Sequence, residues 1–194
     1  IRRTTATPND TNFTNLWGFH NTGQEVNAVL GTSDADIDAP EAWDFEDASQ
    51  QDIIVAVIDS GVLYSHTDLA SNMWDGSSSC NDESGNVIPD GCPNHGWDFV
   101  NGDNDPTDDF GHGTHVAGTV GAVSNNGAGV SGISIANNIK IMAVKFLGAD
   151  GSGTLIDEIK AINFARHNGA QVVNASFGGA GFVQSEKDAV DAFT

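Results

Sequence analysis

One histidine in this sequence stands where a catalytic imidazole could act. His112 lies between Gly111 and Gly113 in residues 108–118, which read DDFGHGTHVAG. The small and apolar run at 116–123 predicts a buried helix, and a histidine in its first turn is held rigidly with its ring beyond the helix end. A lone histidine of this kind is more often a satisfied core residue, so the interpretation depends on a partner.

A carboxylate that could partner this imidazole comes earlier in the chain. Residues 53–58 form a continuous apolar run rich in β-branched side chains, and Asp59, Ser60 and Gly61 follow it. Such a run predicts a central parallel strand covered on both faces. Asp59 is therefore expected at the carboxyl end of the strand, where open α/β sheets hold their catalytic groups. A buried carboxylate needs a partner, and an imidazole N–H can supply one.

The rest of the sequence alternates helices and strands, which predicts an α/β protein with a parallel sheet and right-handed crossovers. A short helix is expected after Asp38, with Asp38 as its cap and Pro40 in its first turn. Residues 62–111 show little periodicity and are predicted as a long loop. A loop of this length must be fastened to the rest of the domain. The further predicted elements are helix 112–123, loop 124–138, strand 139–146, helix 155–167 capped by Thr154, strand 172–176 and a last helix that opens at Ser185.

Two short motifs carry a family resemblance. VIDSG at residues 57–61 and GHGTHVAG at residues 111–118 resemble the motifs of the subtilisin-like serine proteases, the subtilases. The resemblance implies a subtilisin-like parallel sheet flanked by helices on both faces and a triad in the chain order Asp, His, Ser. It makes Asp59 the carboxylate that orients the imidazole and His112 the general base, while His115 is a helix residue and not the base.

The family's third motif, a glycine-threonine-serine run that opens a buried helix, does not occur in these 194 residues, and neither does its oxyanion-hole asparagine. The resemblance covers about the first two-thirds of a catalytic domain of usual family size. We therefore expect residues 1–194 to be a single, incomplete subtilase domain, truncated before its last helices. The nucleophile is expected beyond this chain, so the chain alone is predicted to be inactive.

Two glycine-rich turns follow predicted strands, GADGSG at 148–153 and SFGG at 176–179. Such turns are weak signals alone, because glycine most often only serves the turn. In subtilases the matching segments are extended edges that accept the substrate main chain as an added strand. A phosphate-binding role is disfavoured, since no lysine follows the glycines. The resemblance implies a substrate groove lined by Gly151, Ser152, Gly153, Ser176, Phe177 and Gly178.

Acidic side chains at short intervals predict calcium sites. Asp98, Asp103, Asp105 and Thr107 place hard oxygen ligands in one loop, which suits calcium better than zinc. This loop resembles a calcium loop found before the catalytic histidine in some subtilases. The resemblance also implies a second site that ties the N-terminal arm to the body. Its ligands are expected to be the side chains of Asp10, Asp68 and Asn126 and the main-chain carbonyls of Val123, Ala128 and Val130.

The chain is strongly acidic, with 27 Asp and Glu against 7 Lys and Arg and a formal net charge of −20. No lysine or arginine occurs between residues 4 and 139, which argues against nucleic acid as a partner. No stretch is apolar enough to span a membrane. Cys80 and Cys92 flank one irregular stretch and lack metal-site spacing, so a local disulfide and an oxidising, extracellular setting are expected.

The first 35 residues are polar and broken by glycine. Residues 1–5 are expected to be the end of a propeptide, because Arg2-Arg3 is a candidate processing point, and residues 6–35 are expected to form an N-terminal arm. The side chains expected to anchor this arm onto the body are those of Phe13, Leu16, Trp17 and Phe19.

The sequence thus predicts part of a secreted, calcium-stabilised serine endopeptidase that acts on peptides or proteins. Its own propeptide or a C-terminal fragment are the other expected partners. One alternative is a non-enzymatic calcium-binding or inhibitor-binding module on the same framework, which the intact triad members and groove segments disfavour. Another is a metallohydrolase that uses Asp59, His112 and His115, ranked last because the histidines lack the glutamate of a zincin motif.

Overall fold

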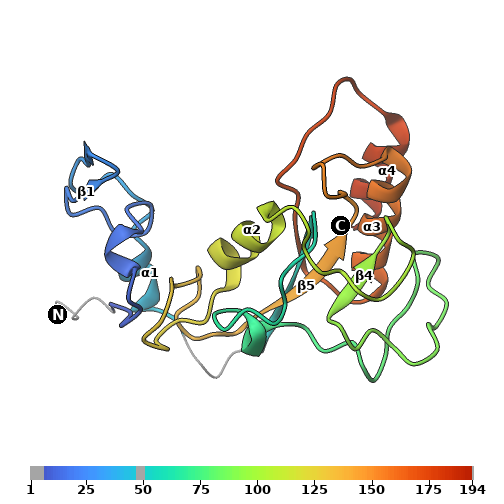
Figure 1. Cartoon of the computed structure of the whole chain (residues 1–194), viewed down its shortest axis with the longest axis horizontal. Coiled ribbons are helices and arrows are strands. Elements are labelled where there is room, and N and C mark those ends of the chain that lie inside the picture. The colour runs from blue at the N-terminus through green and yellow to red at the C-terminus, as the bar shows by residue number, and fades with distance from the viewer. Residues whose placement is uncertain (1–6, 47–50, 194) are drawn as a thin grey trace.

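The apolar run after residue 52 forms the central strand of a parallel sheet. A computed structural model of the chain describes residues 7–46 and 51–193. Strand β3 (Ile53–Asp59) pairs along its whole length with β5 (Ile139–Lys145), and its other edge pairs with β6 (Val172–Asn174). Strand β4 (Gly96–Asp98) adds to the outer edge of β5, which gives the parallel order β4-β5-β3-β6 (Figure 1).

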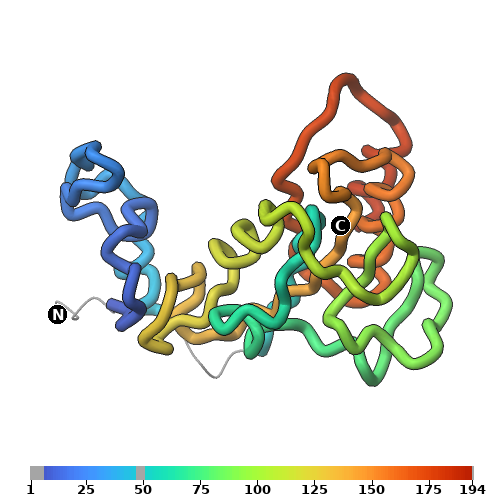
Figure 2. The backbone as a smooth tube through the Cα atoms, in the orientation of Figure 1, coloured from blue at the N-terminus to red at the C-terminus, as the bar shows by residue number. Residues whose placement is uncertain are grey.

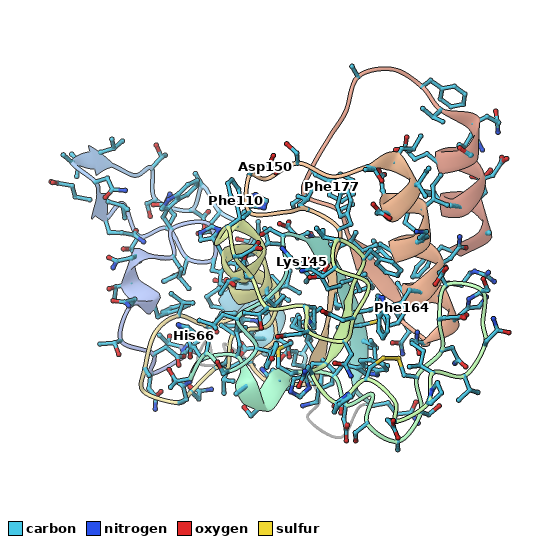
Figure 3. The ribbon with its side chains drawn as sticks, turned by 45° about the vertical axis from the view of Figure 1, so that its right-hand side comes forward. His66, Phe110, Lys145, Asp150, Phe164 and Phe177 are labelled. Atoms are coloured by element: carbon cyan, nitrogen blue, oxygen red, sulfur yellow. A yellow bond between two sulfur atoms is a disulfide. The ribbon has the colours of Figure 1, made fainter. Side chains whose placement is uncertain are left out.

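Helices cover both faces of this sheet, as expected for a strand that is apolar throughout. Helix α2 (His112–Gly121) packs through Ala117 against Val55 and Val57 of β3. Helix α3 (Leu155–His167) packs on the opposite face, where Phe164 joins the cluster around Ile58 (Figure 3). Figure 1 shows α2 on one side of β5 and α3 on the other. The predicted fold class, an α/β parallel sheet with helices on both faces, is confirmed.

The N-terminal residues form an arm that stands to one side of the sheet (Figure 2). The arm contains the 3₁₀ turn η1 (Phe13–Asn15), the hairpin of β1 (Glu25–Val26) and β2 (Val29–Leu30), and helix α1 (Ala39–Trp43). Phe13, Leu16 and Phe19 pack around Trp43, whose Nε1 donates to Ile133 O at 2.7 Å. These three anchors are confirmed, but Trp17 is 55% exposed and does not anchor the arm.

The segment 62–111 was expected to be a loop, and this expectation misses two elements. It contains the 3₁₀ turn η2 (Ala70–Asn72) and β4, which is a strand of the main sheet. At three residues β4 is too short to show an alternating pattern. Gly96 makes its close approach to β5 possible, because a Cβ at this position would lie 1.6 Å from Ala143 O.

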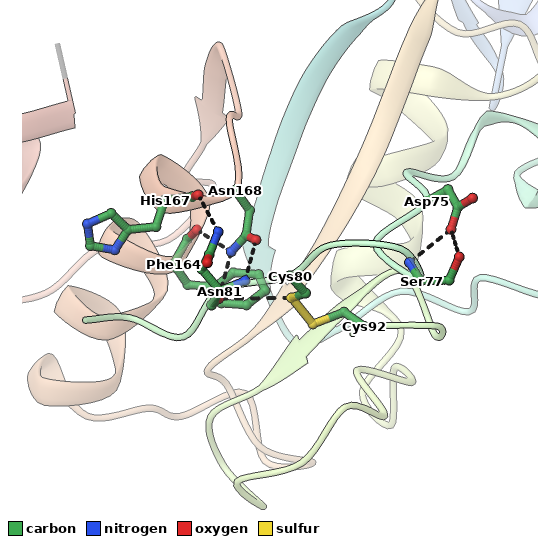
Figure 4. Close-up of a disulfide and its surroundings, with 8 residues drawn as sticks. All are labelled: Asp75, Ser77, Cys80, Asn81, Cys92, Phe164, His167 and Asn168. Atoms are coloured by element: carbon green, nitrogen blue, oxygen red, sulfur yellow. Dashed lines mark hydrogen bonds between the residues drawn. A yellow bond between two sulfur atoms is a disulfide. The ribbon is translucent and has the colours of Figure 1, made fainter. Parts of the chain in front are cut away.

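The predicted disulfide is confirmed and lies in this segment (Figure 4). Cys80 and Cys92 are bonded and both are buried in the cluster that includes Phe164. A pair of hydrogen bonds, which the sequence did not reveal, also joins this loop to the end of α3. Asn81 N donates to Asn168 Oδ1 at 2.8 Å, and Asn168 Nδ2 donates back to Asn81 O at 2.8 Å (Figure 4).

Several predicted helix ends need correction. Thr154 does cap α3, because its side chain accepts from Asp157 N. Asp38, in contrast, adopts a left-handed conformation and makes no side-chain cap bond. Helix α4 (Gln184–Phe193) begins before Ser185, so Ser185 lies inside the helix. Helix α2 ends at Gly121 and not at 123, since Val123 N donates to Asp68 O instead of a helix carbonyl. Strands β5 and β6 are one and two residues shorter than predicted.

The predicted propeptide remnant at residues 1–5 lies outside the residues that the structure describes. In the part of the chain that the structure describes, no helix has the length and apolar character needed to cross a bilayer.

Removal of the disulfide tests how much the Cys80–Cys92 bond stabilises the fold. We expect replacement of Cys80 and Cys92 by Ala to lower the free energy of unfolding by about 3 kcal/mol, because the unfolded chain regains the freedom that the bond removes. Urea unfolding of the parent and the double variant measures this difference. A change below about 0.5 kcal/mol would show that the other contacts of the loop suffice to hold it.

Candidate active site

The predicted carboxylate and imidazole lie in contact. His112 Nδ1 and Asp59 Oδ1 are 2.8 Å apart, and Asp59 has no exposed surface. Asp59 Oδ1 also accepts from Ser60 N at 2.7 Å, whereas Oδ2 has no hydrogen-bond partner among the described residues. Because Nδ1 faces the carboxylate, Nε2 is the ring nitrogen available to a reacting group. The His112 side chain is 41% exposed, so this nitrogen can be reached.

Close backbone contacts bring the two residues together. Asp59 ends β3 and His112 begins α2, and Gly113 N donates to Ser60 Oγ at 2.9 Å. A Cβ on Gly113 would lie 2.1 Å from Gly61 O. Gly61 itself has a φ of +103°, and its Cβ would lie 2.5 Å from Pro106 O. The glycines of both motifs are therefore required by this close approach and not only by turn geometry.

Asp108 fixes the entry to α2, a role that the sequence interpretation missed. Its Oδ1 accepts from Ser60 Oγ at 2.8 Å and Gly111 N at 2.8 Å, and its Oδ2 accepts from Thr114 N at 2.9 Å. Burial raises the pKa of this carboxyl, but the bonds from the Thr114 hydroxyl and from the backbone N–H groups of Gly111, Thr114 and Phe110 outweigh it and lower the pKa below 3.8. The sequence signal that could have revealed this role is a carboxylate just before a predicted helix.

Most of the predicted groove residues line one cavity of about 950 Å³. Gly151, Ser152 and Gly153 border it, and so do Phe177 and Gly178. The sixth residue, Ser176, does not border it; its hydroxyl accepts from Asn174 Nδ2 at 2.8 Å.

The predicted groove and His112 are close along one edge of the molecule. A Cβ on Gly151 would lie 2.9 Å from the Phe110 ring, so the 148–153 turn packs beside the segment that leads into His112. Figure 3 shows Phe110 and Asp150 next to each other, with Phe177 further along the same edge. His115 is exposed and lines a different cavity with His66, so the structure does not gather it with the Asp59–His112 pair.

The side chains predicted for the arm calcium site gather around one loop. Asp10 and Asp68 are 5% and 4% exposed. Asp10 accepts from Asn125 N and Asn126 N, while Asp68 Oδ1 accepts from Asn126 Nδ2 and its Oδ2 from Val130 N. Within the part of the chain that the structure describes, the donors to these two buried carboxylates are all neutral groups, so no cation balances their charges there. The donor set therefore fits calcium. Val123 and Ala128 belong to the same loop, through Val123 N to Asp68 O and Ala128 N to Asn126 Oδ1.

The side chains of the other predicted calcium loop form two hydrogen-bonded groups, which backbone hydrogen bonds between Asp98 and Asp103 join. Buried Asp98 accepts from Val100 N and from the backbone and side chain of Asn101. Asp103 accepts from Asp105 N, and Asp105 accepts from Thr107 Oγ1 at 2.6 Å. The bond from Thr107 is the main reason why the pKa of Asp105 is lowered. Within residues 7–46 and 51–193, no cluster of three or more His, Cys, Asp or Glu side chains is placed to hold a metal ion.

Comparison with known proteins places this geometry in a family. The family model described as "Subtilase family" matches residues 50–193. The chain belongs to the subtilases, the subtilisin-like serine proteases. Thermophilic serine proteinase from Bacillus sp. (strain AK1) is 43% identical over 137 residues, which cover 71% of this chain and 28% of that protein. The extracellular protease of Xanthomonas campestris is 36% identical over 199 residues, which cover 93% of this chain and 31% of that protein.

Solved structures agree with this assignment. A protease from Pseudoalteromonas arctica superimposes with a TM-score of 0.67 at 30% identity, over 97% of this chain and 56% of that one. The chain therefore spans less than a third of the length of the two curated relatives and just over half of this solved protease. The only glycine-threonine-serine tripeptide, Gly31-Thr32-Ser33, does not open a helix, and Thr32 and Ser33 are exposed in the arm.

Asp108 provides a test of how this subtilase holds the entry to α2. We expect Asp108→Asn to lower the free energy of unfolding by about 2 kcal/mol at pH 7, because charge-assisted hydrogen bonds are lost. The folded-state pKa is lowered, so this contribution is present above 3.8 and is lost as the pH falls through the folded pKa. Urea unfolding of the variant and of the exposed-site control Asp52→Asn, at pH 7 and near pH 3, measures it. An equal deficit at both pH values would contradict this electrostatic explanation.

Proposed function

We propose that the protein to which these residues belong is a secreted, calcium-stabilised serine endopeptidase. The observation that carries the proposal is the 2.8 Å contact between His112 Nδ1 and a fully buried Asp59, beside a cavity lined by two glycine-rich segments. An imidazole oriented in this way by a carboxylate is the general base of a serine protease. The serine is not among these residues, and we propose that it is supplied by a part of the same catalytic domain outside them.

In the proposed reaction, His112 Nε2 takes the proton of the serine hydroxyl as its oxygen bonds to the carbon of the scissile peptide. Asp59 holds the Nδ1–H tautomer and stabilises the imidazolium that forms. The imidazolium then gives its proton to the leaving amine as the peptide C–N bond breaks. A water molecule repeats the sequence, passing one proton to His112 as it attacks the acyl-enzyme, and the proton returns to the serine oxygen when the carboxylic acid leaves.

Peptide recognition is proposed for the two groove segments. Gly151, Ser152 and Gly153 would pair with the substrate main chain on one side, and Ser176, Phe177 and Gly178 on the other. Support comes from the cavity that five of these six residues border. The same surface would bind a propeptide, and a C-terminal part of the domain would complete it.

Secretion is supported by the disulfide and by a relative. Disulfides persist mainly in oxidising compartments, and Cys80–Cys92 is formed and buried. The Xanthomonas campestris relative is named an extracellular protease. A net charge of −20 favours solubility in such a setting.

Calcium is proposed as a structural cofactor with no step in the reaction. Side chains of Asp10, Asp68 and Asn126 would hold it together with main-chain carbonyls of Val123, Ala128 and Val130. Two buried carboxylates whose donors among the described residues are all neutral support this site. The loop of Asp98, Asp103, Asp105 and Thr107 stays a predicted second site.

The assignment of the base is tested with the full-length protein and a peptide substrate. We expect His112→Ala to lower kcat/KM by at least about 10⁴-fold while the fold persists, because the proton acceptor is lost. His115→Ala, in the same helix but exposed, is the matched control and should keep activity within a few fold of the parent. Full activity in His112→Ala would contradict the assignment, and a full-length parent without any peptidase activity would favour the non-enzymatic binding module.

Calcium dependence is tested by chelation. A cation that binds only the folded protein adds about 2.7 kcal/mol of stability at one hundred times its Kd, so we expect EGTA to lower the melting temperature. Asp68→Asn should remove most of this calcium-dependent shift, whereas Glu25→Gln, an exposed change of equal charge in the same arm, should leave it intact. A calcium-independent melting temperature in the parent would refute the site.

A further inference from the structure

A buried lysine lies directly behind the Asp59–His112 pair. Lys145 ends β5, is 1% exposed and is among the largest fully buried side chains. Lysine is almost never buried unless its charge is paired and hydrogen-bonded, so such a position needs a reason. The Lys145 Nζ donates to three acceptors, which are Ser60 O at 2.7 Å, Leu147 O at 2.7 Å and Asp109 Oδ1 at 2.6 Å.

These three acceptors belong to three different segments of the site. Ser60 follows Asp59, Asp109 lies three residues before His112, and Leu147 directly precedes the glycine-rich turn that borders the cavity. An ammonium group has three N–H donors, and here each one reaches a separate segment. Figure 3 shows Lys145 near the centre of the molecule, below the edge that carries Phe110, Asp150 and Phe177.

The sheet fixes the base of this side chain next to Asp59. In the parallel ladder Lys145 is the partner of Asp59, and the N–H groups of Phe146 and Leu147 both donate to Asp59 O. Lys145 is thus tied to Asp59 through the backbone, while its Nζ reaches the segment before His112. Lys145 therefore links the segment that follows Asp59 to the segment that precedes His112, without contacting either of these two side chains.

A simple ion pair does not account for this arrangement. The Asp109 side chain is 47% exposed, and a pair with one exposed partner contributes little to stability. Two of the three acceptors are main-chain carbonyls of site segments, which a plain ion pair would not need. Among residues 7–46 and 51–193, Lys145 is also the one lysine or arginine whose side chain bonds to residues 59–62 or 106–113.

We propose that Lys145 is a positioning residue for the Asp59–His112 pair. Its ammonium group holds the turn after Asp59, the segment before His112 and the start of the groove turn at fixed relative positions. The consequence for catalysis rests on the proposed function, whereas the effect on the Asp59–His112 hydrogen bond can be measured in the full-length protein without any activity.

The test follows the His112 Nδ1 proton by NMR. In the full-length parent, this proton should give a resolved low-field signal that exchanges slowly with water, because it is shared with a buried carboxylate. We expect Lys145→Met, which is similar in length but donates nothing, to broaden or abolish the signal. Lys140→Met, at the other end of the same strand, removes an equal charge and should keep it, because the Lys140 Nζ bonds only to Ser71 O among the described residues. A folded Lys145→Met protein with an unchanged signal would overturn the proposal, however much stability it had lost.

A second variant decides the matter if Lys145→Met does not fold. Asp109→Asn alters one acceptor at a half-exposed position that the fold should tolerate, and it weakens the link to the segment before His112. Exchange of the Nδ1 proton should then become several times faster, and an unchanged exchange rate would overturn the proposal.

Kinetics of the full-length protein separate this proposal from the proposed function. A folded Lys145→Met should lower kcat by at least about tenfold with little change in KM, because misplaced catalytic groups slow the chemical step more than binding. If Lys145→Met leaves kcat unchanged in an active protein, the positioning role of Lys145 is wrong and the proposed function stands. An inactive parent with the NMR effect intact would overturn the proposed function alone.

Discussion

A fully buried carboxylate at the end of the central strand sets the conditions for everything around it. Asp59 has strands on both edges of β3 and helices on both faces, so it cannot be solvated by water and needs donors from the protein. Its Oδ1 receives a backbone N–H and the imidazole of His112. Bringing the imidazole this close requires the start of α2 to lie against the turn after β3. Only glycines at 61 and 113 allow that contact.

The acidic composition explains how the remaining carboxylates are accommodated. With no lysine or arginine between residues 4 and 139, nearby N–H and O–H groups take the place of cations. Hydrogen bonds from Asn21 and Asp38 lower the pKa of Asp36, and those from Asn86 lower the pKa of Asp82. Asp108 likewise accepts hydrogen bonds from N–H and O–H groups at the start of α2. The stability of the site therefore depends on short polar turns. Lys145 instead supplies a cation to one of these carboxylates, Asp109, where three segments of the site meet.

The sequence was sufficient for the elements and residues whose signal is local. Long apolar runs predicted β3 and β5, and the two motifs predicted the pairing of Asp59 with His112 that the structure contains. The strand β4 escaped prediction, since three residues carry no period and its place depends on contact with β5. Lys145 was overlooked for a similar reason. A lysine at a strand end is usually exposed, and only the folded chain shows that its three acceptors come from distant segments.

The central claim is that His112 Nε2 faces the reacting centre. Treatment of the full-length protein with a peptidyl chloromethyl ketone, followed by mass spectrometric mapping, tests it most directly, because such a reagent alkylates the ring nitrogen beside a bound substrate carbonyl. We expect one modified histidine, His112, with loss of activity, and no modification of His66 or His115. Inactivation with His112 unmodified, or modification at another histidine, would contradict it.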